Sequence, residues 1–227
     1  MINRIHAALH RPEKGWDPIS PQYAEGYGDK EWKVIDESLV TRIGDLIGGF
    51  AGKKILDLGS GPGQYAIAFA IRGAEVTCHD VSRVYLGIAK NKAAEFNVSD
   101  HMKFSVGYLD EAPQILNQTY DLVFNRVCWY YGFDDWSFAR SVFSLVRAGG
   151  LCFINTPHSK FNYSKLSTIA RFRMWLNQKF SLKIGHPFPP HGRVARTFSN
   201  LPIAQMHIDY TDPHHDCIWF RTFDIQK

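Results

Sequence analysis

Three closely spaced glycines in Asp57-Leu58-Gly59-Ser60-Gly61-Pro62-Gly63 are the first residues whose types and spacing suggest chemistry. Ile55, Leu56 and Leu58 predict a buried strand before them, and the alanine-rich run after Gln64 predicts a helix behind them. Glycines at such a turn let the backbone approach a ligand closely, and the helix N-terminus presents free N–H groups to it. The spacing is G-x-G-x-G, which differs from the G-x-G-x-x-G of dinucleotide-binding turns.

A second acid follows about twenty residues later, in Glu75-Val76-Thr77-Cys78-His79-Asp80. This run predicts a short strand that ends in Asp80, with Ser82 as the N-cap of the next helix. An acid at this offset accepts hydrogen bonds from ribose hydroxyls, because two carboxylate oxygens match two vicinal hydroxyls. The alternative interpretation of Asp80 is a loop acid or helix cap.

The glycine motif and the Asp80 spacing together resemble motif I and the following acid of the class I S-adenosylmethionine-dependent methyltransferases. The resemblance covers residues 50–156 and, more weakly, the last two strands. It implies an α/β fold, a Rossmann-like and mostly parallel seven-stranded sheet in the order 3-2-1-4-5-7-6, with helices on both faces. It also implies S-adenosyl-L-methionine as cofactor, with contacts at Asp57, Gly59, Ser60, Gly61, Gly63, Asp80 and Val81.

The stretch Gly107-Tyr108-Leu109-Asp110 resembles the pattern of a glycine, an acid and a small residue with which this family binds adenine. Tyr108 stands where the family carries the acid. The resemblance therefore places Tyr108 beside adenine, the Leu109 N–H near a ring nitrogen and Asp110 near the amino group. The alternative is that Tyr108 is a core residue at a strand end.

Residues 120–127 resemble the family's motif IV, the strand beside the transferable methyl group, which implies cofactor contacts at Asn125 and Arg126. They lack the Asn/Asp-Pro-Pro-aromatic signature of methyltransferases that modify DNA, RNA or glutamine nitrogen. Tyr130 and Tyr131 stand where many small-molecule members carry a histidine pair. Tyr130 is a candidate acceptor contact, although a phenol with a pKa of ~10 is a poor base at neutral pH. Both tyrosines have the alternative interpretation of aromatic core.

Methyl transfer is an in-line displacement at a sulfonium, so the protein mainly positions the reactants. A hydroxyl nucleophile also benefits from a base with a pKa near 7, which favours histidine. His158 follows the expected fifth strand and is the first candidate; His191, with His186, flanks a proline-rich loop and is the second. The alternative for each is an ordinary structural histidine, the role we expect for His79, His214 and His215.

The composition describes an ordinary globular chain of 227 residues, 45% hydrophobic, with a net charge of +4. No apolar run approaches the ~20 residues that span a bilayer, and residues 1–15 lack the apolar segment of a signal peptide. The four cysteines form no C-x-x-C pair. We therefore expect free thiols in the cytoplasm and no metal site.

The basic charge is concentrated in one part of the chain, because no Asp or Glu occurs between Trp136 and Ile208. This pattern predicts a positive face toward an anionic partner. A helix within 163–183 combines an apolar stripe with a basic edge. Such a helix can pack on the domain, contact a membrane surface, or bind a phosphate or carboxylate group together with Arg193 and Arg196. It can also bind nucleic acid, which is the less favoured use. The ten basic residues of this stretch are Arg140, Arg147, Lys160, Lys165, Arg171, Arg173, Lys179, Lys183, Arg193 and Arg196.

We expect four parts of the chain: an N-terminal cap segment and helix (1–50), a cofactor-binding core (51–156), a basic substrate-side insertion (157–202) and a closing strand pair (203–227). Residues 1–29 are expected to be irregular and 29–47 to form one helix. Strands are predicted at 53–58, 75–79, 103–106, 120–125, 151–155, 203–210 and 216–223, and helices at 63–72, 82–97, 134–147 and 163–180.

The function predicted from the sequence is O-methylation of a small acceptor that is anionic or linked to a glycan or lipid. We expect the protein to be cytoplasmic, and to bind peripherally to a membrane if the acceptor is lipid-linked. Two alternatives stay open at this point. One is methylation of RNA or protein, and the other is a non-catalytic scaffold or regulatory subunit that binds S-adenosylmethionine.

Overall fold

The computed structural model describes residues 2–158, 167–180 and 188–224. Its centre is a seven-stranded sheet in the order β3-β2-β1-β4-β5-β7-β6, which confirms the predicted topology. All neighbouring pairs are parallel except those of β7, which runs antiparallel to both β5 and β6. The strands are β1 (Lys54–Leu58), β2 (Glu75–Asp80), β3 (Met102–Val106), β4 (Tyr120–Arg126), β5 (Val146–Pro157), β6 (Ile203–Asp209) and β7 (His215–Thr222).

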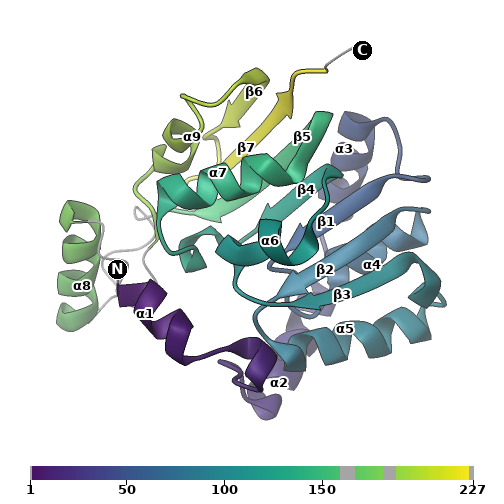
Figure 1. The fold of residues 1–227 in the computed structure, drawn as a ribbon, viewed down its shortest axis with the longest axis horizontal. Helices are drawn as coiled ribbons and strands as arrows, with labels where there is room; N and C mark the ends of the chain where they lie inside the picture. The colour runs from purple at the N-terminus through teal and green to yellow at the C-terminus, as the bar shows by residue number, and fades with distance from the viewer. Residues whose placement is uncertain (1, 159–166, 181–187, 225–227) are drawn as a thin grey trace.

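Helices cover both faces of this sheet and make it the middle of three layers (Figure 1). Side chains alternate between the faces along each strand, so Ile55 packs into one core and Leu56 and Leu58 pack into the other. One layer holds α3 (Glu37–Ile47), α4 (Gln64–Ile71) and α5 (Arg83–Glu95), and the other holds α6 (Ala112–Leu116), α7 (Asp135–Leu145) and α9 (Arg193–Thr197). The described part of the chain also contains the short 3₁₀ turns η1 (Pro12–Lys14), η2 (Ser99–His101), η3 (Leu109–Glu111) and η4 (Trp129–Tyr131).

The N-terminal region is more helical than its sequence predicted, and the expected irregular segment 1–29 and single helix 29–47 were wrong. The structure has α1 (Ile2–Leu9), α2 (Pro21–Lys33) and α3. Ser20 caps α2 with Pro21 at its first position, where a proline costs no hydrogen bond. Asp36 starts α3 by accepting the Leu39 N–H at 3.0 Å, which breaks the periodic pattern that suggested one helix.

Strand β5 also begins earlier than predicted, because residues 147–150 belong to a bulge in the strand rather than to a helix-ending turn. Tyr120 pairs with Val146, whereas the next pair joins Leu122 to Leu151. Gly149 has a φ of +68°, which absorbs the extra residues. Helix α7 therefore ends at residue 145 and not at 147.

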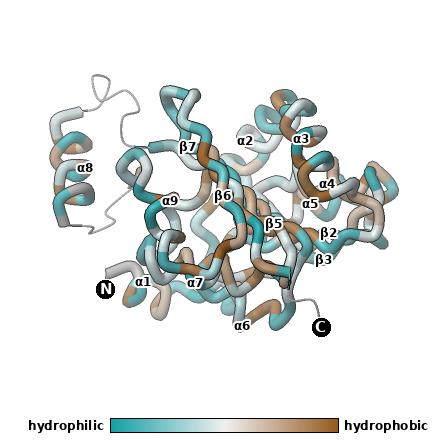
Figure 2. Tube along the Cα trace, turned by 90° about the horizontal axis from the view of Figure 1, so that it is seen from above, coloured by the Kyte–Doolittle hydropathy of each residue, from teal (hydrophilic) through white to brown (hydrophobic). Residues whose placement is uncertain are grey.

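Helix α8 (Thr168–Phe180) stands beside the domain, as the two perpendicular views agree (Figures 1 and 2). It covers the C-terminal part of the predicted helix 163–180, whose first four residues lie outside the described residues. Ile169, Phe172 and Trp175 are exposed on it, while Met174 is buried. No helix in the described part of the chain has both the length and the apolar character needed to cross a membrane.

We predict that Gly63→Ala lowers the free energy of unfolding by about 1–3 kcal/mol. Gly63 has a φ of +82°, and a Cβ there would lie 2.7 Å from Ala89 Cβ. The matched control is Gly87→Ala in α5, where a Cβ meets nothing within 4 Å and the higher helix propensity of alanine favours the fold. Urea unfolding of the three proteins measures the difference, and equal stability of the two variants would contradict the prediction.

Candidate functional site

The glycine loop after β1 has one crowded side and one open side. The Gly59 and Ser60 N–H groups both donate to the His79 carbonyl, at 2.8 and 3.3 Å. A Cβ at Gly59 would lie 2.3 Å from the Cys128 sulfur, so only glycine fits there. A Cβ at Gly61 would meet nothing within 4 Å. The loop therefore presents its backbone to open space at Gly61.

Asp80 ends β2 directly beside this loop. Its Oδ2 accepts the Gly61 N–H at 2.9 Å, and its Oδ1 accepts the Ser82 N–H at 2.8 Å. The N-cap of α5 is Ser82, which accepts the Tyr85 N–H, so Asp80 is not the cap itself. Each carboxylate oxygen keeps capacity for a further donor. Val81 links these two residues and completes the turn.

Asp57 places a second buried carboxyl group close to Asp80. Burial raises its pKa to about 7, and the Asp80 charge adds to the rise. Burial also raises the pKa of Asp80 to about 6. Two buried carboxyl groups with raised pKa values make the surroundings of the glycine loop favourable for a cationic or hydrogen-donating ligand.

Polar atoms without partners lie around the same loop. Within the described residues, Ser60 Oγ, Gln64 Oε1 and Asn125 Oδ1 are buried and have no hydrogen-bond partner. The amide nitrogen of Asn125 donates to the Leu58 carbonyl at 2.9 Å, which fixes the direction of its oxygen. Buried polar atoms normally have partners, so these three oxygens indicate a site for a polar ligand.

Arg126 lies at the end of β4 on the α2 side of the loop. Its guanidinium is 5.0 Å from the Tyr65 ring centroid and 3.9 Å from the Glu31 carboxylate. Gln64 Nε2 also donates to Glu31, at 3.4 Å.

The residue after Arg126, Val127, has a φ of +60°, which is unusual for a β-branched residue and marks a strained turn. No feature of the sequence signalled this strain.

Tyr108 lies in an aromatic cluster that the sequence did not predict. Its hydroxyl donates to the His10 carbonyl at 2.7 Å, and its ring centroid is 6.2 Å from Trp16 and 5.4 Å from Phe133. Burial raises the pKa of Tyr108 to about 12. Leu109 beside it is buried.

Asp110 accepts the Phe133 N–H through Oδ2, at 2.9 Å. This hydrogen bond connects the segment after β4 to the segment after β3. The contact of Asp110 with the adenine amino group, which the sequence suggested, stays a prediction.

The N-terminal segment covers this part of the molecule. Arg11 forms a two-pronged ion pair with Glu111, at 2.8 and 3.0 Å. Arg83 Nε donates to the Pro12 carbonyl at 2.8 Å. A Cβ at Gly28 in α2 would lie 3.7 Å from Pro62 in the glycine loop. Residues far apart in the sequence thus close one side of the site.

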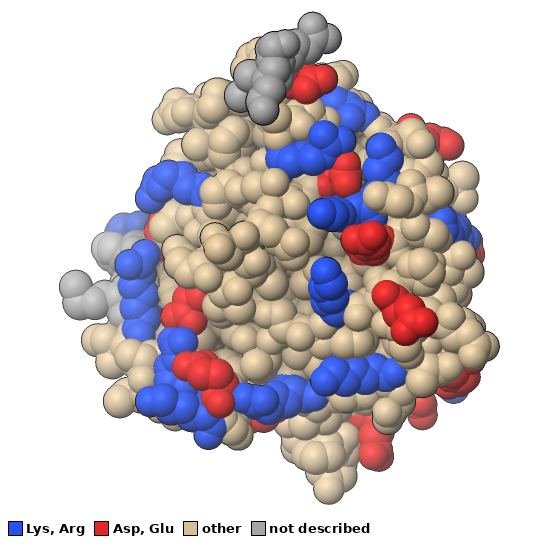
Figure 3. Space-filling model, turned by 45° about the vertical axis from the view of Figure 1, so that its right-hand side comes forward, with Lys and Arg blue, Asp and Glu red and all other residues tan. Residues whose placement is uncertain are grey.

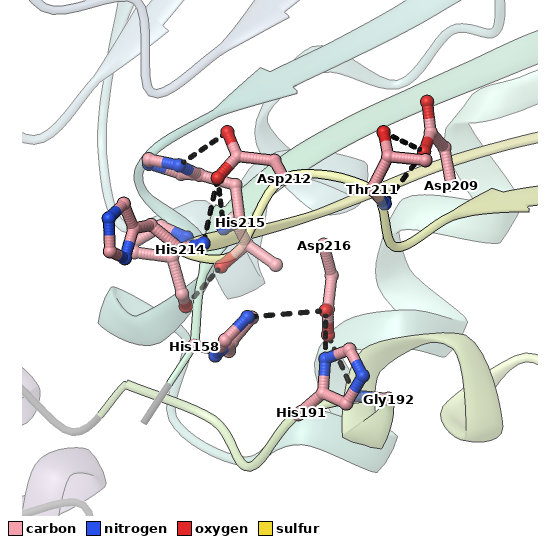
Figure 4. A network of polar contacts seen from close by, with 11 residues as sticks. His158, His191, Gly192, Asp209, Thr211, Asp212, His214, His215 and Asp216 are labelled. Carbon is pink, nitrogen blue, oxygen red and sulfur yellow. Dashed lines mark hydrogen bonds and ion pairs between the residues drawn. The ribbon is translucent and has the colours of Figure 1, made fainter. Parts of the chain in front are cut away.

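A second polar cluster consists of His158, His191 and Asp216 (Figure 4). His191 Nδ1 donates to Asp216 Oδ1 at 2.7 Å, and His158 Nε2 lies 4.0 Å from the same oxygen. Asp216 and His158 are fully buried, and His191 is partly exposed. The structure therefore brings together the two histidines that the sequence named first and second. Asp216 was missed because nothing in the sequence connects it to them.

The remaining candidates fall in different surroundings. Burial raises the pKa of Tyr130 far above its ordinary value, so its hydroxyl stays protonated, and its ring meets Phe188 at 4.9 Å between centroids. His186 lies outside the described residues. Burial lowers the pKa of His79 to about 4, and its ring nitrogens contact Ser105 Oγ and the Tyr108 carbonyl, as a structural histidine would.

Comparison with known proteins identifies the domain. Residues 55–150 match the family model described as "Methyltransferase domain". The chain is 35% identical over 114 residues to a ubiquinone biosynthesis O-methyltransferase from Aeromonas salmonicida, which covers 50% of this chain and 47% of that protein. It is 32% identical over 157 residues to the protein of the same name from Pseudomonas savastanoi, which covers 68% and 61% respectively. The chain thus spans about half to three fifths of the length of these relatives.

Among solved structures, a SAM-dependent methyltransferase from Aquifex aeolicus superposes with a TM-score of 0.63 at 12% identity, over 89% of this chain and 98% of that chain. At this identity the likeness shows the fold alone. It agrees with the strand order described above.

We predict that the cofactor-free protein loses stability as the pH rises from about 4 to about 7. Asp57 has a native pKa of about 7 against an ordinary value of 3.8, so across this window the native state holds a proton that the unfolded chain has released. In Asp57→Asn the free energy of unfolding should fall by roughly 2–4 kcal/mol less over this pH range, because each pKa unit corresponds to about 1.36 kcal/mol. Urea unfolding at a series of pH values measures it.

The matched control is Asp29→Asn, which changes an exposed aspartate in α2. It should reproduce the pH dependence of the unchanged protein. If the Asp57→Asn and Asp29→Asn curves run parallel from pH 4 to 7, the burial argument for Asp57 is wrong.

Proposed function

We propose that this chain, which carries a class I S-adenosylmethionine-dependent methyltransferase domain over residues 55–150, transfers a methyl group to a hydroxyl oxygen of a small acceptor. The observation that carries the proposal is the site after β1, where the open backbone at Gly61 faces the buried Asp80 carboxylate. The O-methyltransferase names of the relatives support oxygen as the reacting atom.

The residues present fit S-adenosyl-L-methionine. The unused acceptor capacity of Asp80 matches ribose hydroxyls, and the buried carboxyl groups suit a ligand that carries a sulfonium and an ammonium group. The unpartnered oxygens of Ser60, Gln64 and Asn125 suit its hydrogen-bond donors. The aromatic side of the site, with Tyr108, suits its adenine.

When bound, the cofactor supplies an electrophilic methyl group, and the chain supplies position. Asp80, Gly59, Gly61 and Gly63 hold the cofactor, and the N-terminal segment excludes water from one side of the site. A hydroxyl acceptor must also lose a proton. We assign His158 and His191 as the candidate proton acceptors, because they lie with Asp216 at the carboxyl end of β5, beside β4.

A hydroxylated aromatic acceptor, of the kind that a ubiquinone precursor provides, fits the acceptor side. Tyr130 and Phe188 supply aromatic surface near the carboxyl end of β4, and burial keeps Tyr130 a neutral phenol by raising its pKa far above the ordinary value. Methylation of RNA is supported less, because Lys and Arg are interspersed with Asp and Glu over much of the face drawn in Figure 3.

We further propose that α8 contacts an anionic membrane surface, which suits a lipid-linked acceptor. Ile169 and Phe172 are 66% and 57% exposed on this helix. Arg171 lies between these two residues in the sequence, and Arg173 lies between Phe172 and the exposed Trp175. A helix with exposed apolar side chains, adjacent basic residues and no acid is typical of interfacial membrane helices. This combination favours anionic lipid over a neutral surface.

The first test uses labelled S-adenosylmethionine with hydroxylated aromatic acceptors, with and without a polyprenyl tail, and with RNA and protein from a cell extract. We expect label in the aromatic acceptors.

Asp80→Ala should weaken cofactor binding by roughly 1–3 kcal/mol, which is the scale of hydrogen bonds to a charged group, and calorimetry measures this change. Asp29→Asn serves as the control. Label only in RNA or protein would replace the proposed acceptor class, and cofactor binding without any turnover would favour a scaffold.

The second test measures binding to vesicles of phosphatidylcholine with and without phosphatidylglycerol by sedimentation. We expect binding only to the anionic vesicles. Phe172→Ser should weaken it by roughly 10- to 100-fold, because burying a phenylalanine side chain contributes about 1.5–3 kcal/mol. The control Ile71→Ser changes a side chain that is 52% exposed on α4 and should have no effect. Equal binding of both variants would refute a role for α8.

A further inference from the structure

The His158–His191–Asp216 cluster has the donor set of a metal site. The ligand atoms of the three side chains all lie within 4.8 Å of one another. Two imidazole nitrogens and one carboxylate are a ligand set that borderline divalent metals bind, and three protein ligands leave further coordination positions open. No part of the cofactor site described above uses these side chains.

The fold holds the three ligands from three segments. In the register of β5 and β7, Thr156 pairs with Asp216, which places Asp216 beside the strand end that leads to His158. The His158 N–H donates to the His214 carbonyl at 3.1 Å, which fixes the backbone there. His191 reaches the cluster from the loop before α9, and Figure 4 shows the three side chains converging. Such support from the backbone preorganises a site.

The Asp216 carboxylate is already oriented for coordination. Its Oδ2 accepts the Gly192 N–H at 2.8 Å, while its Oδ1 faces both imidazoles. Gly192 has a φ of +72°, and a Cβ there would lie 3.2 Å from the Tyr210 hydroxyl, so this position favours glycine. A carboxylate that ligates a metal is usually itself hydrogen-bonded, here by a backbone N–H on the oxygen that faces away from the imidazoles.

We propose that His158, His191 and Asp216 bind a divalent first-row transition metal such as Zn²⁺. Two nitrogen donors favour this class over Mg²⁺ and Ca²⁺, which take oxygen donors. Bonds of about 2.0–2.2 Å to each ligand need donor atoms roughly 3–3.5 Å apart, so His191 moves slightly away from Asp216 and His158 moves closer. When the metal binds, it takes the place of the proton between His191 and Asp216, and that proton is released to solvent.

The partly exposed His191 side chain provides an entry path for the ion. The expectation of no metal site rested on cysteine spacing, which carries no information about this histidine–aspartate set. With the ion bound, both imidazoles would coordinate it and neither would accept the proton. An open coordination position would instead take the acceptor hydroxyl and lower its pKa, and the proton would pass to solvent water, a role that rests on the proposed function. Metal binding itself does not depend on methyl transfer, so the two fail separately.

The test is metal binding by the full chain after treatment with a chelator, without the methyl donor. Calorimetry with Zn²⁺ and absorption spectroscopy with Co²⁺ should show one equivalent bound, with Mg²⁺ unable to compete. His191→Ala and Asp216→Asn should weaken Zn²⁺ binding by at least about 100-fold, beyond the 10- to 100-fold effect of outer-shell changes. Asp216→Asn keeps an oxygen for the Gly192 N–H, and circular dichroism checks that it folds.

Two histidine variants serve as controls. His101→Ala changes an exposed histidine far along the sequence from the cluster, and His10→Ala tests the stacked His6–His10 pair at the N-terminus. Both should bind Zn²⁺ as the unchanged protein does. Absence of Zn²⁺ and Co²⁺ binding by the unchanged protein, or unaltered affinity in His191→Ala, would overturn the proposal. Should Asp216→Asn fail to fold, His191→Ala against His101→Ala decides.

Discussion

A carboxylate buried at the end of β2 must be hydrogen-bonded, and this constraint organises the site around the glycine loop. Asp80 is satisfied by the Gly61 and Ser82 N–H groups, so its position dictates where the loop after β1 runs and where α5 begins. The loop must then pass Cys128 so closely that only glycine fits at residue 59. The residues that hold the cofactor in our proposal are thus also the residues that join β1, β2 and β4.

The direction of the strands explains why two polar centres share one edge of the sheet. The carboxyl ends of β1, β2 and β4 meet there because these strands are parallel, which is where ligands bind in open α/β sheets. Strand β7 is antiparallel, so its first residues, and not its last, reach the same edge. Asp216 near the start of β7 therefore meets His158 just after the end of β5.

The two centres differ in how their charge is balanced. Near the glycine loop, burial raises the pKa values of both Asp57 and Asp80, and the Asp80 charge adds to the rise at Asp57, which favours a ligand that brings positive charge or hydrogen-bond donors. Around Asp216 the neighbours are imidazoles and a backbone N–H, and hydrogen bonds from His191 and Gly192 satisfy the carboxylate. In our proposal the first centre binds the cofactor, and the second acts on the acceptor.

The sequence by itself determined most strands, the glycine loop and the spacing of Asp80, because these depend on local hydrophobic patterns and on spacings within about twenty-five residues. The class of fold and the strand order came from the family resemblance that these motifs carry. The sequence misplaced the start of β5 and the N-terminal helices, where a glycine bulge and the Ser20 and Asp36 caps decide the boundaries. Only the tertiary structure joined Asp216 to His158 and His191, or Trp16 to Tyr108. Those contacts come from antiparallel strand register and from docking of the N-terminal segment, and both depend on packing between residues far apart in the chain.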